Sequence, residues 1–164
     1  MKKQFIYFIF IFAATIVMTS CERDDICIDD TTPNFVIRFF DIDDPTEFKT
    51  VNQLSVKSNT SIVEGDSLLF SSLDSIAIPI NATLTSTQYI LTLDSDNETI
   101  SNKDTLTIRY LSQNVFVGRS CGFKSTFNNV TYTITNDTDN WIQRIEVVTD
   151  QIENETQAHL KILH

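Results

Sequence analysis

The stretch VTYTIT, residues 130–135, decides the fold class of this chain. Its apolar residues Val130, Tyr132 and Ile134 alternate with threonines, so one face of an extended segment would be apolar and the other polar. A period of two is typical of a half-buried β-strand, because successive side chains of a strand point to opposite faces. We therefore predict a strand here and apply the same test to the rest of the chain.

Alternating runs of β-branched and aromatic residues recur from residue 34 onward. Residues 34–40 (NFVIRFF) are apolar on both faces and predict a central strand, whereas Pro79 within the run 76–80 predicts a sheet edge or a bend. Trp141 is expected to fill the core at the start of the penultimate strand. No window of about eleven residues keeps a helical period. The chain is therefore predicted to be all-β, with residues 34–164 forming one immunoglobulin-like antiparallel β-sandwich. The remaining strands are expected at residues 87–93, 105–111, 142–149 and 158–163.

Residues 1–20 have the pattern of an export signal. Two lysines precede an uncharged apolar run, Phe5–Met18, which is shorter than the roughly 20 residues that span a bilayer. The segment that follows, Met18-Thr19-Ser20-Cys21, resembles a lipobox, although the motif prefers Leu where this chain has Met18. In a lipobox the cysteine receives a diacylglycerol and becomes the new N-terminus. We expect lipidation at Cys21, with an ordinary cleaved signal or an uncleaved anchor helix as the alternatives.

Residues 21–33 are predicted to form a lipidated acidic tether. The segment Glu22-Arg23-Asp24-Asp25 resembles the signal that exports lipoproteins of Bacteroidota to the outer face of the outer membrane, but a solvated acidic tether has the same composition. We expect outer-membrane anchoring through the lipid, on the periplasmic or the cell-surface side. Removal of residues 1–20 leaves 10 of the 12 basic side chains and all 22 acidic ones, a formal balance of −12. This balance excludes nucleic acid as a partner, because no basic patch is available for phosphates.

Two cysteines remain besides Cys21. Cys27 and Cys121 form an even pair in an exported chain, which predicts a disulfide. A redox-active pair is the alternative, but the two cysteines lack CxxC spacing and have no nearby histidine to lower a thiol pKa. A bridge between them would tie the predicted tether to the domain.

Catalytic, metal-binding and cofactor-binding motifs are lacking. Only His159 and His164 could act as histidine bases, and His159 is expected to be half-exposed on the last strand. The run from Asp94 to Glu98 begins like a calcium loop, but Thr99 replaces the required glycine. We therefore expect no enzyme activity, no metal site and no cofactor.

Four Asp-Ser/Thr sequences resemble the acceptor pattern of O-glycosylation in Bacteroidota. In that pattern an aspartate precedes the modified hydroxyl residue, and a residue with a methyl group usually follows. A chain rich in Asp, Ser and Thr also produces such sequences by chance. The candidate acceptors are Thr31, Ser67, Ser75 and Thr105.

Several short motifs together resemble a small uncharacterised lipoprotein family of Bacteroidota. They are the lipid cysteine, Asp25-Ile26-Cys27, Thr32-Pro33, the strand Ile37 to Asp41, Arg119 to Phe123 and Ala158 to Ile162. The resemblance implies a paired Cys27 and Cys121 and a β fold, and it implies no activity. The expected function is a non-catalytic binding or assembly module whose partner is an unknown envelope protein or glycan. The alternative is a surface accessory protein for glycan or nutrient capture, which needs exposed aromatic side chains.

Overall fold

The computed structural model describes residue 27, residues 31–58 and residues 67–164. The predicted signal, the predicted lipid site Cys21 and most of the predicted tether lie outside these residues. The described part of the chain forms nine strands and no helix, and it contains no helix with the length and apolar character that a membrane crossing requires. The strands are β1 (Phe35–Phe40), β2 (Leu54–Ser58), β3 (Leu68–Phe70), β4 (Ser75–Ile78), β5 (Ser86–Leu93), β6 (Asn102–Gly118), β7 (Gly122–Ile134), β8 (Arg144–Val147) and β9 (Leu160–Leu163).

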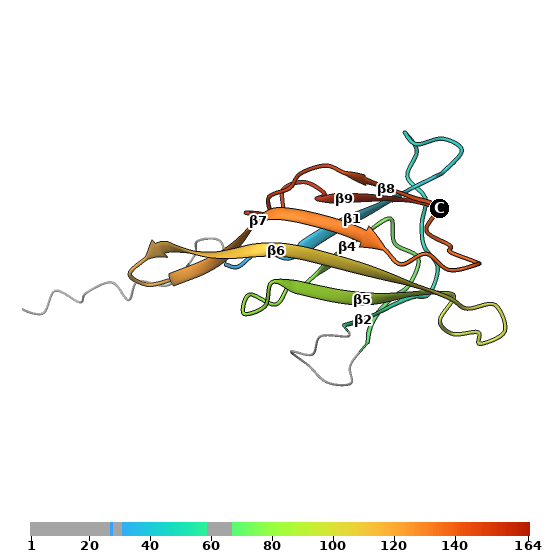
Figure 1. The fold of residues 1–164 in the computed structure, drawn as a ribbon, viewed down its shortest axis with the longest axis horizontal. Coiled ribbons are helices and arrows are strands. Elements are labelled where there is room, and N and C mark those ends of the chain that lie inside the picture. The colour runs from blue at the N-terminus through green and yellow to red at the C-terminus, as the bar shows by residue number, and fades with distance from the viewer. Residues whose placement is uncertain (1–26, 28–30, 59–66) are drawn as a thin grey trace, which may run out of the picture.

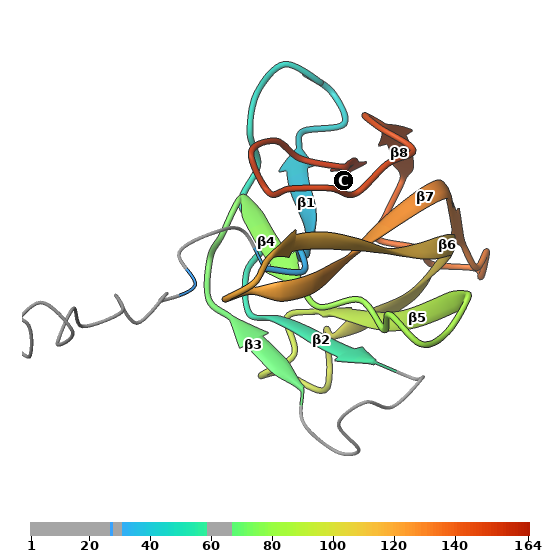
Figure 2. The same ribbon diagram turned by 90° about the vertical axis from the view of Figure 1, so that its left-hand side faces the viewer.

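These strands form two sheets that pack as a sandwich, as Figures 1 and 2 show from two sides. One sheet has the order β4-β1-β9-β8 and the other has the order β3-β2-β5-β6-β7. The predicted all-β sandwich is confirmed. The prediction that all strands pair antiparallel was wrong for one pair of strands. The strands β1 and β9 run parallel, with Ile37 opposite Leu160.

The strand β1 occupies the central position that its apolar faces predict. It pairs with β4 on one side and with β9 on the other. Phe35, Ile37 and Phe39 point into the sandwich and are fully buried. On the opposite face, the ring of Phe48 lies 5.0 Å from that of Phe40, centroid to centroid, and covers it from the loop after β1. Both faces of β1 are therefore covered, which is why neither face of this sequence is polar throughout.

Two further expectations are confirmed at the edge and in the core. The edge strand β4 ends directly before Pro79, whose missing amide proton would break a ladder of hydrogen bonds. Trp141 is 7% exposed, and its Nε1 donates a hydrogen bond of 3.1 Å to the carbonyl of Leu91. The tryptophan therefore fills the core and connects the segment before β8 to β5.

The β6–β7 hairpin is much longer than the predicted strands at 105–111 and 130–135. The β5–β6 pairing stops at Ser86 and Arg109, whereas the β6–β7 pairing continues to Gly118 and Gly122. The outer half of the hairpin has exposed side chains on both faces over much of its length, so it lacks the alternation that identifies a half-buried strand. At the tip, Gly122 has φ +70°, as three-residue hairpin loops commonly require.

Other boundaries also differ from the predictions. The strand expected at 142–149 is only β8, and the one expected at 158–163 begins at Leu160. The short strands β2 and β3 were not predicted at all. His159 was expected to be half-exposed on a strand, and this expectation was wrong, because it precedes β9 and is 2% exposed. Its ring is hydrogen-bonded to Val36, 123 residues away in the sequence, and local alternation does not reveal such a contact.

Candidate functional site

The outer part of the β6–β7 hairpin, residues 111–128, projects from the sandwich and is called the ribbon below. Figure 1 shows it extending well past the end of β5. Over most of its described length the ribbon consists of two strands, because β5 no longer accompanies β6 beyond Arg109, and at its base Phe127 forms a bridge to Ile152. A two-stranded hairpin by itself is marginally stable in water. The ribbon therefore depends on contacts with other parts of the protein.

A disulfide between Cys27 and Cys121 provides the first of these contacts. The two Cα atoms are 4.9 Å apart, and 94 residues separate the cysteines in the sequence. The predicted bridge is confirmed. Cys121 lies in the turn between β6 and β7, so the disulfide fixes the segment before β1 to the tip of the ribbon.

Hydrogen bonds continue this attachment toward β1. The amide nitrogen of Ser125 donates to Oγ1 of Thr32 at 2.9 Å. Both the amide nitrogen and Nδ2 of Asn34 donate to Oε1 of Glu155, at 2.8 and 3.0 Å. We call this set of contacts, together with the disulfide and the His159 contact described next, the tether clamp. It joins the entering chain to the ribbon and to the loop before β9.

The imidazole of His159 is the buried part of the tether clamp. The amide of Val36 donates to its Nδ1 at 2.9 Å, and its Nε2 lies 2.9 Å from the carbonyl of Asn154. Since Nδ1 must accept, the neutral ring carries its proton on Nε2 and donates it to Asn154. Burial lowers the pKa of His159 below its ordinary value, and this effect outweighs the Asn154 carbonyl and the Glu155 charge, which favour protonation.

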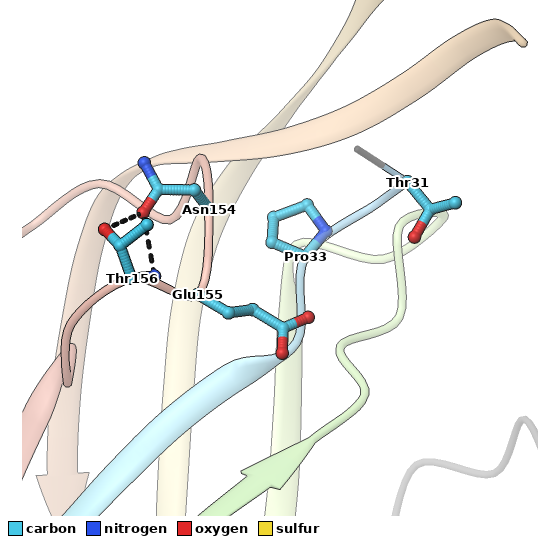
Figure 3. A pocket seen from close by; sticks show the side chains of 5 residues that line it. All are labelled: Thr31, Pro33, Asn154, Glu155 and Thr156. Carbon is cyan, nitrogen blue, oxygen red and sulfur yellow. Dashed lines mark hydrogen bonds between the residues drawn. The ribbon is translucent and has the colours of Figure 1, made fainter. Parts of the chain in front are cut away.

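Three small pockets flank the tether clamp. The pocket in Figure 3 has a volume of about 250 Å³ and is lined by Thr31, Pro33, Asn154, Glu155 and Thr156. Two of its acceptor atoms are already engaged, because Oδ1 of Asn154 accepts hydrogen bonds from Thr156 and Oε1 of Glu155 accepts from Asn34. The second, of about 240 Å³, lies beside the disulfide. The third, of about 150 Å³, is lined by His159, Glu153 and their neighbours. All three are smaller than the roughly 300–1,000 Å³ of typical ligand sites.

The ribbon carries exposed aromatic side chains that the sequence did not single out. Phe116 and Phe123 are 59% and 69% exposed, and their ring centroids lie 5.3 Å apart in an edge-to-face arrangement. Residues 105–136 also contain three basic side chains, Arg109, Arg119 and Lys124, and no acidic one. In so acidic a chain, this acid-free run is the signal that could have identified the ribbon.

The four candidate glycosylation acceptors lie in different environments. Thr31 and Ser67 are exposed and lie outside strands. Ser75 lies in β4 and is half-buried, and its hydroxyl donates to the carbonyl of Ile37 at 3.2 Å. Thr105 lies in β6 and follows Asp104, whose carboxylate is buried and accepts a hydrogen bond from the amide of Ile142 at 2.8 Å. Surface access therefore favours Thr31 and Ser67, and modification of any of the four stays a prediction.

Acidic side chains are not gathered into a metal site. Within residues 27, 31–58 and 67–164, no group of three His, Cys, Asp or Glu side chains is placed to hold a metal ion. Burial raises the pKa of Asp104. The hydrogen bonds that its carboxylate accepts from Ile142 and Asn140 oppose this shift. Asp104 thus connects β6 to the turn before β8.

Removal of the disulfide should weaken both the domain and the ribbon. Because the bridge spans 94 residues, the chain-entropy model predicts that Cys27→Ala with Cys121→Ala lowers the free energy of unfolding by about 4–5 kcal/mol. Chemical denaturation measures this change, and amide hydrogen exchange should accelerate first in residues 111–128. Ribbon protection equal to that of the parent protein would contradict the dependence of the ribbon on the bridge.

Acidification should destabilise the fold through His159. Its pKa is lower in the folded chain than the ordinary value of about 6.5, so the unfolded chain binds the proton first as the pH falls. The stabilisation is fully present above pH about 6.5 and is lost as the pH falls from there to the folded pKa. Denaturation curves measured between pH 7.5 and 4.5 should show a shallower loss for His159→Gln than for the parent. His164→Gln is the control for the other histidine, whose pKa is also lowered by burial. An unchanged pH profile in His159→Gln would contradict this role.

Comparisons with known proteins give a family and no function. No curated protein and no solved structure matches the chain. A family model described as "Family of unknown function (DUF6452)" matches residues 50–164, which is more than half of the chain. The match includes β2 to β9 and Cys121 but starts after β1 and Cys27. The chain therefore belongs to the family of unknown function DUF6452.

Proposed function

We propose that this protein is a cell-envelope lipoprotein whose β-sandwich is a non-catalytic binding or assembly module. The observation that carries the proposal is the tether clamp, which begins at Cys27, only six residues after the predicted lipid site Cys21. Six extended residues reach at most about 20 Å. A lipid on Cys21 would therefore hold the sandwich close to its membrane instead of on a long flexible leash.

The lipid supplies the affinity that such a position requires. One acyl chain gives only marginal membrane binding, whereas two or three chains hold a domain stably. The motifs around Cys21 and Cys27 also support an origin in Bacteroidota and attachment to the outer membrane, on its periplasmic or cell-surface side. A clamp at the membrane end is useful for assembly, because it gives the domain a defined distance from the lipid.

Binding is favoured over catalysis by the way the polar groups are used. The carboxylates of Glu155 and Asp104 and the imidazole of His159 each accept hydrogen bonds from backbone amides. These groups hold loops in place and are not arranged around a common cavity. The pocket beside Glu155 has no second acid and no aromatic side chain among the described residues that line it.

The alternative of glycan or nutrient capture receives less support. It requires exposed aromatic side chains that stack on a sugar ring, and Tyr89, Tyr110, Tyr132 and Trp141 are all buried. The exposed aromatic side chains of the described residues are phenylalanines, which add no hydrogen-bonding group for a sugar. The exposed apolar side chains on edge strands suit a protein partner better. Leu69 lies on β3 and Val147 lies on β8, and each of these strands is at the edge of its sheet. Such edges can accept a strand from a partner.

Metabolic labelling with an alkyne fatty acid tests the anchor. The parent protein should incorporate the label, and Cys21→Ala should not, because the acceptor sulfur is missing. Thr19→Ala serves as a control that alters the same segment and keeps the sulfur. An unlabelled parent, or equal labelling of Cys21→Ala, would overturn the lipoprotein assignment.

Photo-crosslinking in cells tests the assembly module. A photoreactive amino acid at Leu69 or Val147 should yield a specific adduct with an envelope protein, which mass spectrometry identifies after detergent solubilisation. The same photoreactive amino acid at Asp96, which lies in an exposed turn, is the control for non-specific crosslinking. Adducts no more abundant at the two edge positions than at Asp96 would argue against edge-strand assembly.

A further inference from the structure

We infer that the tip of the ribbon contacts the membrane directly, with Phe116 and Phe123 in the interface between lipid headgroups and acyl chains. This inference rests on the proposed lipid at Cys21 and adds a second, protein-made contact to it. The exposed phenylalanines would thus contact lipid and not a protein partner.

The ribbon presents exposed apolar side chains near its tip. Phe116 and Phe123 face each other across β6 and β7, and both expose more than half of their surface. Val115 and Leu111 on β6 are also exposed, on the face of the ribbon opposite to Phe116. Exposed apolar groups clustered on a projecting element are typical of interaction sites. Aromatic side chains in particular favour the membrane interface.

The charge of the ribbon points the same way. Arg119 lies in the turn between the two phenylalanines, and Lys124 directly follows Phe123. Long basic side chains can cover apolar surface with their stems while their charged ends reach lipid phosphates. The contact of Lys124 with Glu153 is a hydrogen bond of 3.3 Å from Nζ of Lys124 to the backbone carbonyl of Glu153, and it does not involve the carboxylate.

The tether limits which lipids can be involved. Residues 22–30 hold five acidic side chains and one basic one, and this excess of negative charge opposes approach to an anionic surface. The aromatic contact must therefore operate on zwitterionic lipid, where the phosphate is available to Arg119 and Lys124 without a net repulsion. We accordingly assign the ribbon tip to a zwitterionic membrane surface.

Position decides between a membrane and a protein partner. The disulfide places the turn of the ribbon within six residues of Cys21, so the anchor and the two phenylalanines reach the same surface. The hydrogen bonds of the tether clamp keep the chain entering β1 attached to the ribbon. A lipid-anchored domain with this connection cannot turn its ribbon far from the membrane.

Fluorescence quenching in vesicles tests the inference on the full lipidated protein. Phe123→Trp is reconstituted into vesicles of phosphatidylethanolamine and phosphatidylcholine with or without brominated acyl chains. The emission of the new tryptophan should shift to shorter wavelength and lose intensity with brominated lipid. The native Trp141 is buried in the core, so the parent protein supplies the background signal.

Phe48→Trp is the matched control. Phe48 is 52% exposed, and it packs on Phe40 at the end of β1 that is remote from the tether clamp. Figure 1 shows the loop after β1 at the opposite end of the sandwich from the ribbon. Its tryptophan should keep its intensity in brominated vesicles. Phe116→Trp repeats the test at the second position in case Phe123→Trp fails to fold.

The outcomes separate this inference from the proposed function. Protein that floats with the vesicles while Phe123→Trp and Phe116→Trp stay unquenched overturns the membrane contact and leaves the anchor intact. Equal quenching of Phe48→Trp also overturns the membrane contact, because the ribbon would then be no closer to the acyl chains than the opposite end of the sandwich. Protein that neither floats nor carries acyl mass on Cys21 contradicts the proposed lipoprotein itself.

Discussion

The Cys27–Cys121 disulfide is the constraint on which the arrangement of this protein depends. It joins a two-stranded ribbon, which lacks the support of a third strand, to the chain that enters the first central strand. Each of these elements limits the freedom of the other. The bridge alone would leave the entering chain able to pivot, and the hydrogen bonds of Thr32 and Asn34 remove that freedom. The result is one structural unit at one end of the sandwich, made from segments that are far apart in sequence.

Polar side chains, two of them buried and one exposed, hold backbone segments in this architecture. His159 accepts from the backbone of β1, Glu155 binds the chain just before β1, and Asp104 accepts from the backbone before β8. A buried amide without a partner is costly, so His159 and Asp104 each stabilise a backbone segment packed against the sandwich. Glu155 is exposed and holds the chain before β1 from the surface. Groups engaged in this way are poor candidates for chemistry. This use of polar side chains is the structural reason for preferring a binding module to an enzyme.

The proposed anchor gives the two ends of the molecule different roles. The ribbon end would face the lipid, where exposed phenylalanines and basic side chains are favourable. The edges of both sheets remain available along the sides, with Leu69 on one and Val147 on the other. Membership of DUF6452 covers β2 to β9, so most of the sandwich is a family feature, while β1 and Cys27 lie outside the matched region.

The sequence by itself determined the fold class, because the alternation of apolar and polar residues follows directly from the geometry of a half-buried strand. It also indicated the central place of β1, the edge at Pro79, the core role of Trp141 and the pairing of the two cysteines. The tertiary structure decided the full length of β6 and β7, the parallel pairing of β1 with β9 and the burial of His159. On β6 the ribbon is exposed on both faces from Leu111 to Phe116, so no local period marks it. Parallel pairing and the His159 hydrogen bonds join residues more than a hundred positions apart, and only the folded chain brings them together.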